Sequence, residues 1–119
     1  MHAVTASFSM DPSRKARLIE ELDPTIIKMV REMPGYVVGF WSWDHATNVT
    51  YAFTIFEQEE QARTLESTVR GMAEKNAVPG TRLERVVTAE IVGAASGNAA
   101  RKLDGANLWA RFGSPTAGA

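Results

Sequence analysis

YVVGFWSW (residues 36–43) and VTYAFTIF (residues 49–56) are the two stretches that decide the fold of this chain. Both are rich in aromatic and β-branched residues, which favour strands. The polar run DHATN (residues 44–48) separates them and is typical of a hairpin loop. Because the first stretch is apolar at almost every position, we expect its strand to be covered on both faces.

The segment before the hairpin predicts one strand and one helix. Residues 2–9 (HAVTASFS) alternate between a more apolar and a more polar set, which is the pattern of a strand. Asp11 then suits a helix N-cap, and Pro12 suits the first helical position, where its missing N–H costs nothing. Apolar residues follow at spacings of three and four until Pro34 and Gly35 end the helix.

Pro24 interrupts the apolar stripe of this first helix. A proline inside a helix removes one backbone hydrogen bond and clashes with the preceding turn. We therefore expect a kink or a restart of the helix near Asp23 and Pro24, with Asp23 as a candidate second N-cap.

The segment after the hairpin predicts a second helix and a last strand. Ala62, Leu65, Val69 and Met72 follow one another at spacings of three, four and three, which forms a clean apolar seam on a helix. Residues 82–93 (RLERVVTAEIVG) alternate between apolar and polar side chains, as a strand does. The complete order is strand, helix, strand, strand, helix, strand.

This order predicts the α+β class and a ferredoxin-like βαββαβ fold with a four-stranded antiparallel sheet. We expect one domain over residues 1–93 and a C-terminal tail over residues 94–119. The small and polar composition of the tail favours disorder, whereas Leu108, Trp109 and Phe112 favour docking on other parts of the protein. Both alternatives, a disordered tail and a tail docked on a dimer, stay open.

Composition excludes several classes of function. The chain has 119 residues and a net charge of −1, so it offers no broad basic field for nucleic acid. It has no cysteine and two histidines, which argues against disulfides and against a dedicated transition-metal site. No signal peptide and no stretch of roughly 18 apolar residues is recognised, so we expect no membrane partner and a cytoplasmic protein.

The hairpin predicts a second subunit. Two helices can cover one face of a four-stranded sheet, and the other face must meet water or another sheet. A strand over residues 36–43 exposes one of two sets, either Val37, Trp41 and Trp43 or Tyr36, Val38 and Phe40, and the strand over residues 49–56 adds Val49, Tyr51, Phe53 and Ile55 to one face. Leaving such a patch in water is unusual for a monomer, and a two-fold partner covers it in both copies at once. We therefore expect a homodimer.

Two short motifs resemble the antibiotic biosynthesis monooxygenase-like family of dimeric α/β-barrel proteins. They are MPGY at residues 33–36 and FEQEEQA at residues 56–62. The resemblance covers residues 2–93. It implies two sheets that close into a dimeric barrel with the helices outside, and a cavity in each subunit between sheet and helices. Some members oxidise polycyclic phenols or quinols with oxygen and without metal or flavin, and others degrade haem.

The sequence departs from the haem-degrading branch of that family. This branch places a histidine near the end of the second helix, an asparagine on the first strand and a tryptophan on the third. Residues 72–77 contain no histidine here, the first strand offers Ser7 and Ser9, and the third strand carries Tyr51 and Phe53. We therefore expect no haem and no other cofactor.

The candidate site consists of aromatic side chains and one histidine. An apolar pocket that stacks a planar substrate and holds its deprotonated oxygen suits a cofactor-independent oxygenase. The candidates are Tyr36, Trp41, Trp43, Tyr51, Phe53 and His45. The alternative is that these rings belong to the core or to the dimer interface, where aromatic side chains are also common. His45 beside Asp44 is either a proton shuttle or a turn residue.

The expected function is therefore an antibiotic biosynthesis monooxygenase-like protein that binds a small aromatic or quinone-like molecule between helices and sheet. Catalytic residues are not assigned, and the expected reaction is oxygenation without a cofactor. The alternative is a dimeric module that binds ligand or serves as a scaffold without chemistry. An enclosed cavity with an unpartnered polar atom would favour the enzyme.

Overall fold

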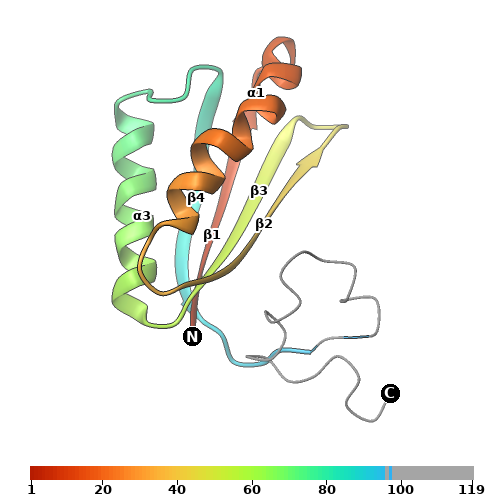
Figure 1. The fold of residues 1–119 in the computed structure, drawn as a ribbon. Coiled ribbons are helices and arrows are strands. Elements are labelled where there is room, and N and C mark those ends of the chain that lie inside the picture. The colour runs from red at the N-terminus through yellow and green to blue at the C-terminus, as the bar shows by residue number, and fades with distance from the viewer. Residues whose placement is uncertain (96, 98–119) are drawn as a thin grey trace.

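A computed structural model describes residues 1–95 and residue 97. These residues form a four-stranded antiparallel sheet with helices on one face (Figure 1). The strand order is β2-β3-β1-β4. The strands are β1 (His2–Met10), β2 (Tyr36–Asp44), β3 (Val49–Phe56) and β4 (Thr81–Glu90). The predicted ferredoxin-like α+β fold is thereby confirmed, and β4 ends three residues before the predicted position.

The first helical segment runs without interruption through the proline. It consists of η1 (Pro12–Arg14), α1 (Lys15–Leu22), the π-helical turn η2 (Asp23–Ile27) and α2 (Lys28–Arg31). Asp23 has helical backbone angles (φ −65°, ψ −52°), so the predicted restart with Asp23 as a second N-cap is wrong. The wider turn accommodates Pro24, because the Lys28 N–H reaches back five residues to the Asp23 carbonyl. Asp11 does cap the start of the segment, and hydrogen bonds from Ser13 lower the pKa of its carboxyl.

An irregularity near the start of β2 decides which side chains share a face. The pairing of β2 with β3 shifts between Tyr36 and Val38, as in a β-bulge. Tyr36 therefore lies on the helix-covered face together with Trp41, where its ring meets Phe56 edge to face at 5.9 Å between centroids. Val38 and Phe40 lie on the opposite face. The strict alternation predicted for this strand, with Tyr36 opposite Trp41, is corrected.

The two motifs that carry the family resemblance meet in space. The Glu57 N–H donates to the Gly35 carbonyl at 2.9 Å, which joins residues 33–36 to the start of α3 (Glu59–Glu74). Gly35 has φ +77°, and a Cβ there would lie 1.8 Å from the Gln61 Oε1 atom. Only glycine fits this contact without rearrangement. Gln61 in turn accepts from the Gln58 N–H at 3.0 Å and caps α3.

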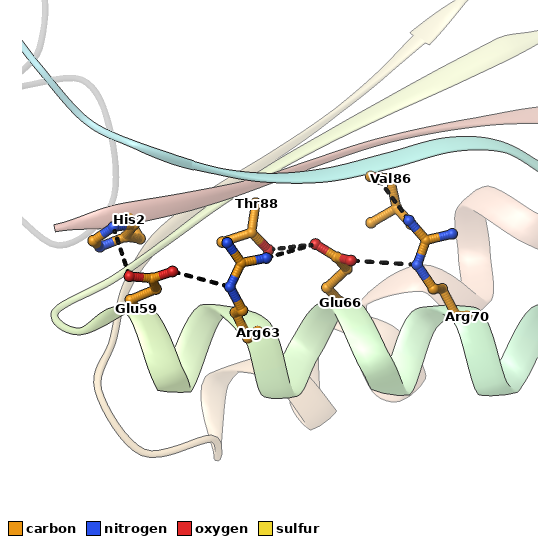
Figure 2. A network of polar contacts seen from close by, with 7 residues as sticks. All are labelled: His2, Glu59, Arg63, Glu66, Arg70, Val86 and Thr88. Atoms are coloured by element: carbon orange, nitrogen blue, oxygen red, sulfur yellow. Dashed lines mark hydrogen bonds and ion pairs between the residues drawn. The ribbon is translucent and has the colours of Figure 1, made fainter.

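Helix α3 packs closely against the sheet. Its buried residues Ala62 and Leu65 join a core with Val4, Ala6, Val30, Phe56 and Val86. Figure 2 shows a polar network along the same helix. Glu66 accepts from the Thr88 hydroxyl at 2.7 Å, and Arg70 Nη2 donates to the Val86 carbonyl at 3.1 Å, so both side chains connect α3 to β4.

Candidate binding pocket

A cavity of about 330 Å³ lies between the first helical segment and the sheet. Its position follows from a difference between the two helices. α3 lies directly against β1 and β4, whereas α1 makes no comparable approach to any strand within the described residues. Figure 1 shows α1 projecting across the sheet near the hairpin end. Leu18, Ile19 and Leu22 carry the apolar stripe of α1, and they line the cavity instead of filling it.

The wall of the cavity is largely apolar. The sheet contributes side chains from all four strands, and both helices contribute aliphatic and methionine side chains. The principal lining residues are Val4, Ala6, Phe8, Met10, Leu18, Leu22, Ile26, Met29, Trp41, Trp43, Ala52, Val69, Met72 and Leu83. Such a wall favours an apolar, flat ligand, and its methionines allow adjustment to shape.

Trp41 is the aromatic wall residue with a free polar atom. Its indole N–H donates to no acceptor among the described residues. The ring lies against Gly39, where a Cβ would come within 2.7 Å of the Trp41 ring carbon Cη2 and 2.9 Å of the Tyr36 hydroxyl. Gly39 therefore leaves the room in which the indole lies. A ligand oxygen could accept this N–H. The cavity is open to solvent, so of the criterion set from the sequence only the unpartnered polar atom is present, and the enclosed cavity is not.

Trp43 lies at the hairpin end of the cavity and is held from two sides. Its indole Nε1 donates to Asn48 Oδ1 at 3.3 Å. Asn48 has φ 56°, and its backbone bonds both to Asp44 and to Met10, which fixes the turn against β1. On the other side, Lys15 Nζ lies 5.8 Å from the centre of the Trp43 ring.

His45 lines the mouth of the cavity and is exposed. The Asp44 carboxylate accepts from the Ala46 N–H at 2.9 Å. This bond, followed by one from the Thr47 hydroxyl, lowers the pKa of the Asp44 carboxyl. Within the described residues Asp44 thus holds the turn and makes no hydrogen bond to the imidazole. The interpretation of His45 as a residue oriented by Asp44 has no support in this geometry.

The other predicted site residues lie elsewhere. Tyr36 packs beside the cavity against Phe56 and outside its lining, and burial raises the pKa of its phenol. Tyr51 and Phe53 lie on the uncovered face of the sheet, where 48% and 39% of their surfaces are exposed. Their placement in the pocket is corrected, because β3 turns Ala52 and Thr54 toward the helices instead.

Sequence reasoning missed the contribution of the helices and of β1. Leu18, Leu22 and Met10 line the cavity, yet none of them is among the residues predicted for the site. The apolar stripe on α1 could have indicated these residues, because an apolar helix face that lies opposite small side chains of the sheet leaves a cavity between them. The thin wall of Ala6 and Ala52 opposite the helix supplies that space.

The described part of the chain holds no cluster of three or more histidine, cysteine or acidic side chains that could bind a metal ion. The end of α3 lines the cavity with Met72, Ala73, Asn76 and Ala77, which offer no imidazole to a haem iron. This donor set does not fit haem. None of the helices in residues 1–95 is long and apolar enough to cross a membrane.

The chain forms a ferredoxin-like α+β domain with a cavity between helix and sheet, and known structures share this fold. A proposed antibiotic biosynthesis monooxygenase from Deinococcus radiodurans superposes with a TM-score of 0.58 at 14% identity, over 81% of this chain and 97% of that chain. A monooxygenase from Streptomyces coelicolor, solved with the ligand nanaomycin D, gives 0.56 at 19% identity, over 78% and 88%.

A third structure is a mutant of MhuD with two manganese protoporphyrin IX molecules per active site. It gives a TM-score of 0.62 at 13% identity, over 82% of this chain and all of that chain. No protein-family model matches the sequence, and no curated protein matches it significantly. The chain therefore has the fold of antibiotic biosynthesis monooxygenase-like proteins, as the two motifs predicted.

Proposed function

We propose that this protein binds a small, planar aromatic or quinone-like molecule in the cavity beneath α1 and oxygenates it without a cofactor. One observation carries the proposal. An apolar cavity of about 330 Å³ is walled by Trp41, whose indole N–H has no acceptor among the described residues. Cavities of this size suit small organic ligands. A polar donor in an apolar wall suits a ligand with few oxygens.

The chemistry asks little of the protein. An electron-rich phenol supplies the electrons itself. A phenol and O₂ give a quinone and water, and each product receives one of the two atoms of O₂. The pocket must bind the ring, exclude water and stabilise the negative charge on the phenolate oxygen. Trp41 Nε1 is the group proposed for that stabilisation. The absence of an imidazole at the end of α3 supports oxygenation over haem chemistry.

We further propose a homodimer formed through the uncovered face of the sheet. Phe40 and Phe53 pair across β2 and β3 there, and Tyr51 lies two residues away on β3, opposite Ser42. Each of the three rings has about two-fifths or more of its surface exposed. Such a contiguous aromatic patch marks an interface. A two-fold axis would place the two sheets face to face and leave each cavity on the outside, beneath its own helices. The cytoplasm remains the expected location.

The direct test measures binding and turnover separately. Full-length protein is titrated with anthraquinone-2-carboxamide, with tryptophan fluorescence as the signal, and is then incubated with 1-naphthol under air. We expect micromolar binding and formation of 1,4-naphthoquinone with matching O₂ uptake. Trp41→Phe keeps an aromatic ring, although a smaller one, and removes the N–H, so we expect turnover to fall about tenfold or more while carboxamide binding changes less.

Two results would change this conclusion. Binding without O₂ uptake for any phenol tried would favour the ligand-binding module over the enzyme. Absence of binding would overturn both and leave the scaffold.

A further inference from the structure

We infer that the preferred ligand carries an anionic substituent, a carboxylate or an acidic phenolate, which lies at the hairpin end of the cavity beside Lys15. This inference rests on the proposed function, because it names a chemical feature of the molecule that the same cavity binds. It depends on the charges around the mouth, and these are distributed unevenly.

Lys15 is a cation without a counter-ion. It is half-buried, while its neighbours Arg14 and Ala16 are exposed. Its Nζ atom makes no ion pair or hydrogen bond within the described residues. It lies over the Trp43 ring, 5.8 Å from the ring centroid. By contrast, Arg17 and Lys28 each pair with a carboxylate one turn further along the helix, at 3.0 and 2.8 Å.

The carboxylates near the mouth are already engaged. Asp11 accepts from Ser13 at the start of η1, and Asp44 accepts from the hairpin turn. Glu21 is the lining carboxylate of the described residues, and its Oε1 atom pairs with Arg17. Of these three carboxylates Glu21 is neutralised by an ion pair, whereas Asp11 and Asp44 keep their charge and are held by donors of their own turns. None of the three pairs with Lys15.

The position of Lys15 is set by the fold and not by chance. The residue follows η1 directly, and its backbone N–H bonds to the Pro12 carbonyl, which fixes the first turn. Trp43 is fixed in turn by Asn48. The ammonium group is not itself part of the cavity lining, but it lies 5.8 Å from the centre of the Trp43 ring, which is. Its partial burial strengthens its attraction for an anion.

A flat ligand that extends from Trp41 to Trp43 would present its far end to Lys15. A carboxylate there could replace the water around the ammonium group, while the ring system stays in the apolar wall. The Trp43 ring contributes by holding the lysine in place, so little side-chain freedom is lost on binding.

The test compares two probes of nearly the same shape, the anionic anthraquinone-2-carboxylate and the neutral anthraquinone-2-carboxamide. Dissociation constants are measured on the full-length chain by tryptophan fluorescence at pH 7.5. We expect the carboxylate to bind about tenfold more tightly, equivalent to about 1.4 kcal/mol. The preference should shrink in 0.5 M NaCl, because the mouth is open to solvent.

Variants assign the preference to Lys15. Lys15→Met keeps the aliphatic stem and removes the charge, so the carboxylate should lose its advantage while carboxamide affinity stays within about twofold. Lys15→Arg should retain the preference. Lys28→Met is the matched control, since it removes a lysine of the same helical segment that already pairs with Glu32.

The outcomes separate this inference from the proposed function. If both probes bind the wild type equally, or if Lys15→Met keeps the preference, the inference is overturned and the pocket stands. If neither probe binds, both conclusions fall.

Discussion

Phe53 and Phe56 are three residues apart on β3 and lie in opposite environments. Phe56 is completely buried beneath the helices, in contact with Tyr36. Phe53 points to the other face, where 39% of its surface is exposed next to Phe40. The same residue type therefore serves the interior of the protomer on one face and a free surface on the other.

The two faces also differ in how completely they are filled. On the covered face α3 is bound to β4 through Glu66 and Arg70 (Figure 2). α1 makes no comparable approach to a strand among the described residues, and the cavity lies beneath it. The uncovered face is aromatic and has no cover within the described residues. The covered face thus holds the core and the cavity proposed as the ligand site, and we expect the uncovered face to supply the dimer contact.

The largest effect should come from the covered face. Phe56→Ala removes a fully buried ring from the core, and we expect the free energy of unfolding to fall by about 3–5 kcal/mol. Urea denaturation followed by circular dichroism measures it. If this variant does not fold, Phe56→Leu should still fold and lose about 1 kcal/mol. A negligible loss in both variants would contradict the assignment of Phe56 to the core.

The matched change on the uncovered face is Phe53→Ser. It should leave the folded protomer intact but weaken self-association, because the exposed part of the ring is worth about 1 kcal/mol per copy. Two copies per dimer give about 2 kcal/mol, or a dimer dissociation constant about thirtyfold higher. Sedimentation equilibrium measures it. A wild-type protein that is monomeric at all concentrations would refute the interface, and an unfolded variant would show that Phe53 belongs to the core.

The strands, the helices and their order were predictable because they depend on local patterns. Residues 49–56 alternate cleanly, and Ala62 to Met72 keep helical spacing, so both elements lie where the sequence places them. The face of the sheet on which each side chain lies was harder to predict. The irregularity beside Tyr36 reverses its face, and nothing in the apolar run of residues 36–43 marks that position.

The site was predictable in part. Trp41, Trp43 and His45 line the cavity, whereas Tyr51 and Phe53 do not, because aromatic character alone does not say which face of β3 a ring occupies. Pro24 shows a second limit. The sequence predicts that the helix is perturbed there, but the choice between a new N-cap and a π-helical turn depends on how Ile26 and Val30, which follow the proline, pack into the core. The structure describes only residues 94, 95 and 97 of the tail predicted for residues 94–119, so disorder or docking of the tail stays a prediction.

Gly39→Ala should affect the cavity more than the fold. The added Cβ would meet the Trp41 ring at 2.7 Å and the Tyr36 hydroxyl at 2.9 Å, so the indole must move. We expect the affinity for anthraquinone-2-carboxamide to fall about tenfold, about 1.4 kcal/mol, with a change in tryptophan fluorescence. Gly71→Ala is the control, since no atom lies within 4 Å of its added Cβ. Unchanged affinity in Gly39→Ala would mean that Trp41 does not shape the ligand site.

The smallest effect tests how the covering helix is attached to the sheet. Thr88 donates to Glu66 at 2.7 Å, and this bond is the main reason why the pKa of the Glu66 carboxyl lies below its ordinary value of 4.5. A lowered pKa in the folded state stabilises the fold above pH 4.5, and the contribution is lost as the pH falls through the lowered value.

Thr88→Val should therefore cost about 0.5–1 kcal/mol at pH 7 and less at pH 3. A double-mutant cycle with Glu66→Gln, measured by urea denaturation at both pH values, isolates the pair. Equal costs at the two pH values would assign the loss to packing of the threonine methyl group, and α3 would then be held to the sheet by its apolar seam and not by this polar contact.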